Sequence, residues 1–292
     1  AITDKLHVLP GIRANYDQKD LDYKRETYGG IANPTAAQLK LLKGVYSNQA
    51  FTANTDNTNF SGQITVAYKV SKKINAFATY ANSYKPIGIN LGGIPNAANG
   101  RPDSTITTIK PEQVNHIEIG IKTTPTKNST LNLTVYNTDI KDYQALVQSQ
   151  DITQNRGYLA NVEKVNVRGA ELDGDIKIGS HLSFYGSLAY TDAKDVSFTN
   201  APLPLEETGS KDANGVQYYA KDASGGSLPG VSKWAGSIGG EYSTEGKLLN
   251  KSGRFYIATD ASGRSTFSSS PIPSAYLNIA GYALLNARIG FR

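Results

Sequence analysis

Residues 59–70 read NFSGQITVAYKV, and apolar side chains occupy nearly every second position of this stretch. The apolar members are Phe60, Ile64, Val66, Tyr68 and Val70, and polar or charged residues stand between them. Successive side chains of a β-strand point to opposite faces, so this period of two predicts a strand with one apolar and one polar face. The same period recurs about ten times along the chain, which predicts an all-β fold.

The expected strands are joined alternately by short turns and by long polar loops. The long loops are expected at about 18–57, 86–110, 145–160, 192–230 and 263–278. A soluble sandwich also alternates, but a transmembrane barrel needs strands of about 10 residues to cross roughly 25 Å of lipid, with the long loops on one side. We therefore expect an antiparallel transmembrane β-barrel whose long loops lie outside the cell.

The composition excludes several other classes of protein. The chain has 292 residues, 39% of them hydrophobic, and a mean hydropathy of -0.39. No apolar run approaches the roughly 18 residues of a membrane-spanning helix. A net charge of +5, with Lys and Arg spread along the chain, argues against nucleic-acid binding. The absence of Cys excludes disulfides and thiol chemistry, and the absence of Met indicates a processed chain or a fragment.

No catalytic, metal or cofactor signature stands out in the sequence. His7, His116 and His181 are far apart and lie on expected strands or turns. The stretch 236–239, GSIG, lacks the spacing of a nucleophile elbow. The acidic stretch 173–175, DGD, lacks the ligand positions of a calcium loop. We therefore expect a protein that is not an enzyme.

The strict alternation also assigns a face to each strand residue. Apolar residues on one face are expected to contact lipid: Phe60, Ile64, Leu133, Leu182, Phe184, Leu188, Ile257 and Leu285. A charge that points into lipid costs about 2–4 kcal/mol at the midplane, so charged strand residues are expected to face a polar interior. These are Arg13, Lys69, Glu118, Lys122, Lys164, Arg168, Glu171, Arg254 and Arg288. Either cross-strand ion pairing or contact with a domain that fills a wide barrel would use these charges.

Four stretches in the first two thirds of the chain carry a family resemblance. Residues 109–122, IKPEQVNHIEIGIK, resemble the strand most typical of TonB-dependent receptors, with Lys/Arg-Pro-Glu followed by Glu-hydrophobic-Gly-hydrophobic-Lys. Three further stretches agree in order over about 95 residues: YANSYKP at 80–86, VYNTDIKDY at 135–143 and VRGAELDG at 167–174. Each stretch is degenerate alone, but the four in order are specific.

The resemblance implies a 22-stranded barrel in a Gram-negative outer membrane, closed by an N-terminal plug. Residues 1–292 are then expected to supply about ten strands, without the plug, the TonB box and the last strands. The implied function is import of a scarce ligand, most often a ferric siderophore, with energy relayed by TonB. The implied partners are that ligand, the TonB complex through the plug, and outer-membrane lipid and lipopolysaccharide.

Aromatic and cationic residues of the long loops are the candidate ligand contacts. Such side chains suit an anionic, aromatic metal chelate through charge and cation–π contact. The candidates are Tyr84, Arg101, Arg156, Tyr158, Tyr218 and Tyr219. The sequence does not name the ligand, because selectivity depends on variable loops and on the plug.

Two alternatives from other classes stay open at this point. One is a complete ten-stranded barrel that carries a protease or lipase site on its loops. The other is a soluble all-β surface adhesin domain. The terminal strands separate the first alternative from the receptor, because residues 5–17 and 282–291 would pair with each other only in a closed ten-stranded barrel.

Overall fold

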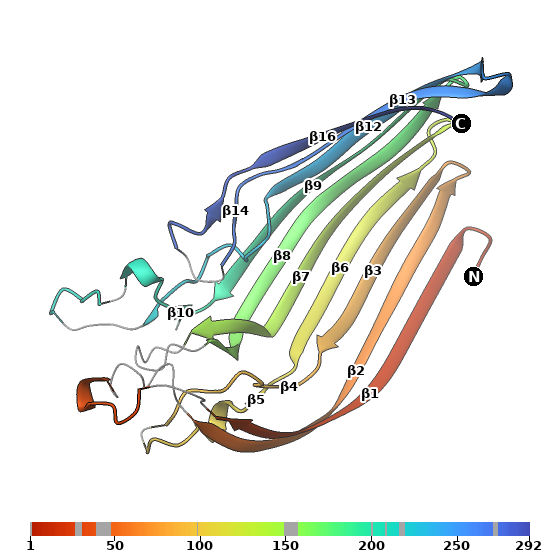
Figure 1. Cartoon of the computed structure of the whole chain (residues 1–292). Helices are drawn as coiled ribbons and strands as arrows, with labels where there is room; N and C mark the ends of the chain where they lie inside the picture. Colours follow the sequence, from red (N-terminus) through yellow and green to blue (C-terminus); the bar gives the residue numbers. More distant parts are fainter. Residues whose placement is uncertain are drawn as a thin grey trace.

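The computed structural model describes residues 2–26, 31–38, 48–97, 99–148, 157–199, 201–207, 209–215, 220–270 and 274–292. Ten long strands form one antiparallel sheet, in which every strand lies beside the next long strand of the sequence (Figure 1). In sheet order they are β1 (Leu6–Arg25), β2 (Gln49–Ser71), β3 (Ile74–Lys85), β6 (Glu112–Thr123), β7 (Ser129–Gln148), β8 (Gly157–Ile178), β9 (Leu182–Ser197), β12 (Trp234–Leu248), β13 (Lys251–Arg264) and β16 (Tyr282–Phe291). This order confirms the expected antiparallel all-β fold.

Short and long connections alternate as expected, so the sheet has a short-turn end and a long-loop end (Figure 1). At the short-turn end, β12 and β13 are joined by Leu249 and Asn250, whose φ angles are 50° and 65°. Two successive left-handed residues are the signature of a tight hairpin that matches the twist of its strands. Both chain ends also lie at the short-turn end (Figure 1).

The strands run further into the expected loops than the apolar pattern indicates. The loop expected at 18–57 is shortened from both sides, because β1 continues to Arg25 and β2 begins at Gln49. In this extension the few apolar residues, such as Leu21 opposite Ala53 and Tyr23 opposite Phe51, lie on the other face from Ile12 and Phe60. The face of Ile12 and Phe60 becomes polar, and Asn54 donates to Asp20 there. Likewise β7 and β8 shorten the loop expected at 145–160, and β9 continues to Ser197.

The remaining loop segments contain short paired elements. These are β4 (Gly88–Ile89) with β5 (Thr108–Ile109), β10 (Ala201–Pro202) with β11 (Ala220–Lys221), β14 (Phe267–Ser268) with β15 (Asn278–Ile279), and the 3-10 helices η1 (Ser104–Ile106) and η2 (Leu205–Glu207). Within the described residues, no helix has the length and apolarity needed to cross a membrane.

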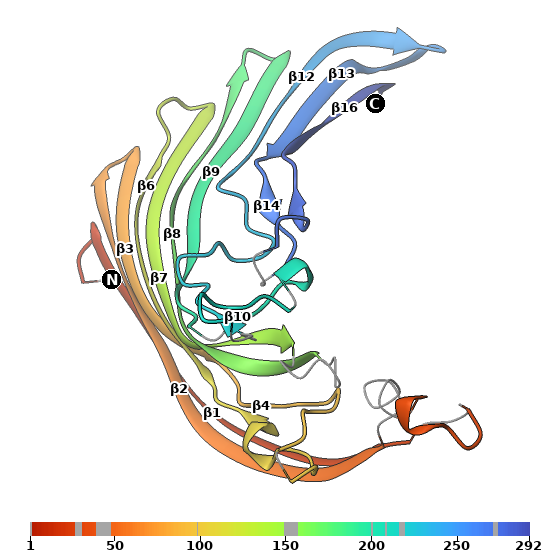
Figure 2. The same cartoon turned by 90° about the vertical axis from the view of Figure 1, so that its left-hand side faces the viewer.

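The sheet is an open arc with the loops on its concave side (Figure 2). Val165 of β8 and Ala193 of β9 pack against Leu228 of a loop, so this set of alternate positions faces the concave side. The other set faces the convex side. The strand register brings its apolar residues side by side across neighbouring strands, as in the row Leu133, Leu172 and Leu188, so they form a continuous apolar band. The same pairing places all eight residues expected to contact lipid on the convex face.

Aromatic side chains border the convex apolar band. Tyr190 and Trp234 lie on neighbouring strands toward the long-loop end, with ring centroids 4.9 Å apart. Phe255 and Phe291 form a similar pair toward the short-turn end, at 4.8 Å. Aromatic rings at both borders of an apolar band are typical of membrane barrels, because the rings favour the interface between lipid and water.

Glycines on the concave face make room for aromatic rings of the neighbouring strand. Gly120 lies directly opposite Phe77, and Gly169 directly opposite Tyr136. A Cβ at Gly120 would lie 2.5 Å from the Phe77 ring, so only glycine lets the ring lie flat on the wall. This contact also fixes the facing of β3, whose alanines leave its sequence pattern ambiguous.

Candidate ligand-binding site

The loop between β3 and β6 is tied to the wall by buried amide side chains. The side-chain nitrogen of Asn90 donates to the carbonyl oxygens of Ile106 and Leu159, at 2.7 and 3.0 Å, and its oxygen accepts from the Leu159 N–H. Gln49 of β2 pairs in the same way with the backbone of Ile94, at 2.7 and 3.0 Å. In each amide both the nitrogen and the oxygen have a hydrogen-bond partner, so the side chain holds the loop without leaving a buried polar group unpaired.

A second polar network holds the base of this loop against β7. The Glu112 carboxylate accepts from the Lys85 Nζ at 2.9 Å and from the Gln144 N–H at 2.8 Å. The Gln144 side-chain nitrogen donates to the carbonyls of Pro86 and Lys110, both at 2.9 Å. Glu112 is only 6% exposed, so its charge is stabilised by these donors and not by water.

Beyond these networks, the end of the β7–β8 hairpin bends over the concave side (Figure 2). Asp142 has a left-handed φ of 53°, and its carbonyl accepts from the Asn161 side chain at 2.7 Å. Past this bend, the hairpin packs against the loop between β9 and β12 through a small apolar core: Ala145, Val147, Val162, Phe198, Ala201 and Ala223. The end of the β7–β8 hairpin and the loop between β9 and β12 therefore form a packed layer with its own core.

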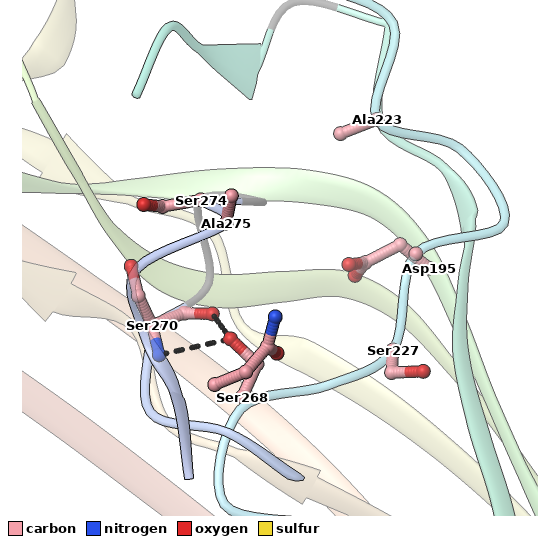
Figure 3. Close-up of a pocket in the computed structure, with 9 residues that line it drawn as sticks. Asp195, Ala223, Ser227, Ser268, Ser270, Ser274 and Ala275 are labelled. Atoms are coloured by element: carbon pink, nitrogen blue, oxygen red, sulfur yellow. Dashed lines mark hydrogen bonds between the residues drawn. The ribbon is translucent and has the colours of Figure 1, made fainter. Parts of the chain in front are cut away.

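A cavity of about 360 Å³ lies between this layer and the loop that joins β13 to β16 (Figure 3). Most residues that line it are small, and several carry hydroxyl groups: Asp195, Ala223, Gly226, Ser227, Ser268, Ser270, Ser274, Ala275 and Asn278. The Ser268 hydroxyl donates to the Ser270 carbonyl at 2.9 Å and accepts from the Ser270 N–H at 3.3 Å. The cavity thus presents hydrogen-bonding groups from three separate segments of the chain.

The Asp195 carboxylate points into this cavity (Figure 3). Asp195 belongs to β9 and is 5% exposed, and burial raises the pKa of its carboxyl group to about 6. The group can therefore gain or lose a proton near physiological pH, and its ionised form suits a ligand that brings a cation or hydrogen-bond donors.

The predicted ligand residues do not line this cavity. Tyr84 lies half-buried at the end of β3, close enough to Asp17 of β1 for their side chains to interact. Arg101 is exposed in the loop before η1. Tyr158 packs against the apolar core of the loop layer, and burial, with the nearby Asp103 charge, raises the pKa of its hydroxyl. The other three candidates, Arg156, Tyr218 and Tyr219, lie outside the described residues.

The cavity residues escaped the sequence reasoning because no motif joins them. Asp195 does sit three residues after Asp192 at the end of an alternating stretch, on the phase that faces the interior. The alternation of β9 could therefore have predicted that Asp195 faces the interior, but it gives no such information for the other cavity residues. The serines come from a Ser/Pro-rich loop whose path over the concave side no local pattern reveals.

The register places most of the predicted interior charges on the concave face: Arg13, Lys69, Glu118, Lys122, Glu171, Arg254 and Arg288. Arg288 lies 3.7 Å from Asp260, and the Lys122 Nζ lies 5.3 Å from the centroid of the Phe77 ring. An ion pair therefore accounts for Arg288, and a cation–π contact accounts for Lys122.

The predictions for Arg168 and Lys164 are wrong. Both residues are in phase with Leu172 along β8, so they lie on the convex face, where Arg168 pairs with Asp192. Strict alternation along β8 already placed them there. The rule that charges avoid lipid led to the wrong face, because β8 continues past the apolar band, where a convex charge meets a polar environment.

Comparison with known proteins agrees with this architecture. Residues 1–292 match the family described as TonB dependent receptor-like, beta-barrel. The chain is similar in structure to the ferric yersiniabactin uptake receptor FyuA from Yersinia pestis, with a TM-score of 0.68 and 15% identity over 99% of this chain and 36% of that chain. It is also similar to the siderophore receptor PiuA from Acinetobacter baumannii, with a TM-score of 0.63 and 16% identity over 98% of this chain and 34% of that chain.

A third similar structure is the ferric-catecholate import receptor Fiu from E. coli K12. The TM-score is 0.61, at 20% identity over 100% of this chain and 36% of that chain. At such identities the likeness shows the shared fold, and the chain spans about a third of the length of these receptors. Together with the family match over the whole length, the curved strand wall and its convex apolar band show that this chain belongs to the TonB-dependent receptor β-barrel family, a family of outer-membrane transport receptors.

Proposed function

We propose that this chain is part of the wall of a receptor that imports a scarce ligand, a ferric siderophore, with energy relayed by TonB. One observation carries the proposal: an unbroken convex apolar band is backed by a polar concave face, over which the long loops fold. A wall of this kind separates lipid from an aqueous passage, and the loop layer offers a site at one end of that passage.

The proposed receptor is larger than this chain. β1 and β16 lie at the two edges of the sheet, so neither has a neighbouring strand on its outer side among the described residues. In lipid, each unsatisfied backbone group costs several kcal/mol, so both strands need partners. We propose that they pair with further strands of a 22-stranded barrel and that a plug domain contacts the concave charges.

The long-loop end is proposed to face the outside of the cell. The cavity and the candidates Tyr84, Arg101 and Tyr158 lie at this end, so ligand capture is assigned to it. The convex band is proposed to contact outer-membrane lipid and lipopolysaccharide.

The enzyme alternative is not favoured by this architecture. A complete ten-stranded barrel requires that β1 pairs with β16, whereas the two strands are at opposite edges of the sheet. Across the described residues, no three His, Cys, Asp or Glu side chains form a metal-binding group. The adhesin alternative is not favoured either, because the family consists of transport receptors.

The proposal is tested in cells that depend on the full receptor for growth under iron limitation. Radiolabelled iron is supplied as a panel of ferric siderophores, in strains with and without TonB. We expect uptake of at least one complex and its loss without TonB. If no complex is taken up, the assigned cargo class is wrong, and uptake that persists without TonB contradicts the energy coupling.

The cavity is tested in the same strains with Asp195→Ala, and Asp222→Ala is the matched control. Asp195 lies near the end of β9 and Asp222 lies in the loop that follows it, and Asp222 does not line the cavity. Reduced uptake with Asp195→Ala alone would support ligand capture in the cavity, and equal uptake by both variants would contradict it.

A further inference from the structure

Asp195 carries a buried carboxylate that has no partner among the described residues. The residue is 5% exposed, and burial is the one cause of its raised pKa, because no cation or hydrogen-bond donor of that part of the chain reaches the carboxylate. The loop holds its backbone: the Asp195 N–H donates to the Gly226 carbonyl at 2.9 Å, and the Asp195 carbonyl accepts from the Gly225 N–H at 2.6 Å. The side chain is thus fixed with its carboxylate in the cavity (Figure 3). A carboxylate removed from water is costly unless a cation or donor replaces the water, so this cavity lacks one partner.

Two neutral oxygen acceptors line the same cavity. The Asn278 amide makes no side-chain hydrogen bond within the described ranges. The Ser268 hydroxyl spends its proton on the Ser270 carbonyl and accepts from the Ser270 N–H, so one of its two lone pairs stays free. The Ser274 oxygen, in contrast, already accepts from the Tyr276 N–H at 3.2 Å. The cavity therefore offers one negative charge and two neutral acceptors.

This lining suits a protonated primary amine better than an anionic chelate or a metal ion. No Lys, Arg or aromatic residue lines the cavity as the structure describes it, so an anion beside Asp195 would meet like charge. A bound calcium ion takes six or more oxygen ligands, whereas no three His, Cys, Asp or Glu side chains of the described residues form a metal-binding group. A protonated amine brings one positive charge and three N–H donors, which equals one carboxylate and two neutral acceptors.

The size of the cavity limits what can enter. Its volume of about 360 Å³ corresponds to about twelve waters at about 30 Å³ each. Pockets for drug-sized ligands span about 300–1,000 Å³, so this one is near the lower limit. It would hold the amine-bearing arm of a larger ligand, with the rest of that ligand outside the cavity.

The concave wall below the cavity carries the same sign of charge. Glu171, Asp173 and Asp175 occupy three successive concave positions of β8, are exposed, and form no ion pair with any described residue. Glu171 is six residues along β8 from Val165, which lies opposite Asp195, so these carboxylates begin about 20 Å along the strand from the cavity. A passage lined by one sign of charge concentrates ligands of the opposite sign, so this wall also favours a cationic ligand.

We propose that the cavity is a binding site for a protonated primary amine, with the Asp195 carboxylate as its counter-ion and Asn278 and Ser268 as its neutral acceptors. The site rests on the proposed function only in that the amine would be one arm of the imported ligand. A ligand without a cationic arm would leave the buried carboxylate unpaired, so the site would select ligands by the charge of that arm.

Protonation of Asp195 gives this site a characteristic pH dependence. With a pKa of about 6, roughly one carboxyl group in eleven is ionised at pH 5 and nearly all are ionised at pH 7.5, so amine binding should weaken about tenfold at pH 5. Asp195 is the one titratable residue among those that line the cavity. Nearby groups keep one state over this range: burial raises the pKa of the Tyr143 hydroxyl on β7, and a hydrogen bond from Ser274 lowers the pKa of Glu206 in η2. Lys194 is on the convex face, where an ion pair holds it.

The test uses the full receptor in detergent, with propylammonium as the probe and propanol, at equal ionic strength, as its uncharged counterpart. Hydrogen exchange, followed by mass spectrometry, is measured in the loop segment 221–230, whose Gly225 and Gly226 amides bond to the backbone of Asp195 and Ala223. Opening of this segment would release the probe, so bound probe slows exchange. A ligand of four heavy atoms can reach a dissociation constant of about 1 mM, so 10 mM probe should slow exchange about tenfold at pH 7.5. At pH 5 the effect should fall to about twofold.

Asp195→Asn keeps the size of the side chain and removes its charge, so the probe should no longer slow exchange. Asp222→Asn is the matched control, because Asp222 is an exposed carboxylate of the same loop that does not line the cavity, and this variant should respond as the parent does. Asn278→Ala removes one neutral acceptor from an exposed position and should weaken the effect severalfold.

Equal exchange with and without propylammonium in the parent, equal protection by propanol, or protection that persists in Asp195→Asn would overturn the site. If Asp195→Asn does not fold, the measurement at pH 5 removes the same charge from the parent, and undiminished protection there also overturns the site. The measurement contains no iron chelate, so its outcome is separate from the cargo. Import of ferric siderophores without any effect of the amine would contradict only this site, and an amine effect in a receptor that imports no ferric siderophore would contradict only the assigned cargo.

Discussion

Substitution of Leu133 by Arg tests which face of the wall meets lipid. Leu133 is the middle of three convex apolar residues on β7, between Leu131 and Val135. The next convex charge along β7 is Asp139, six residues beyond Leu133. Six residues of a tilted strand advance about 15 Å along the membrane normal, whereas half of the apolar band is about 12 Å. Leu133 is therefore near the midplane, and Asp139 lies just outside the band.

An arginine at this depth costs about 2–4 kcal/mol, a factor of about 30 to 1,000 in the folding equilibrium. Thr134→Arg is the control, because Thr134 is the next residue, faces the concave side and lies opposite Glu171. The assay is denaturant unfolding of the full receptor from lipid vesicles. We expect a large loss of stability for Leu133→Arg and little change for Thr134→Arg. Equal losses, or a greater loss for Thr134→Arg, would refute the assigned facing.

Three further predictions follow from the same structure. Leu188→Cys and Ser187→Cys should differ in their reactivity toward an aqueous thiol reagent in intact membranes. The cysteine at 187 should react and the cysteine at 188 should be protected by lipid, and similar reactivity would contradict the assigned faces. Gly169→Ala should destabilise the barrel by about 1–3 kcal/mol in thermal unfolding, because its Cβ would lie 2.2 Å from a backbone oxygen, whereas Gly92→Ala meets no atom within 4 Å and should be neutral. Burial raises the pKa of Asp195 to about 6, so the loop layer is most stable below the ordinary value of 3.8 and loses stability as the pH rises through 6. Asp195→Asn should therefore protect this layer from limited proteolysis at neutral pH and have little effect near pH 4, and a protection that does not depend on pH would contradict the assignment.

The sequence by itself determined the strand wall and its two faces. The period of two in residues 59–70, repeated along the chain, was enough to predict the convex positions of Phe60, Ile64 and Leu188, because a strand offers only two faces and lipid accepts only one kind of side chain. The alternation of short turns with long loops was also readable, since turn residues and apolar patterns mark the lipid-crossing part of each hairpin.

Only the tertiary structure decided what happens beyond the apolar band. There the convex positions become polar, so β1 and β2 run on without the apolar stripe that marks their lipid-crossing parts, and Arg168 lies on the face opposite to the predicted one. The ligand cavity also depends on distant segments, because Asp195 meets Ser268 and Ser274 only when two loops fold over the concave side. Lipid imposes a strict pattern that one sequence displays, whereas loop packing depends on contacts between residues far apart in the chain, which leave no local period to read.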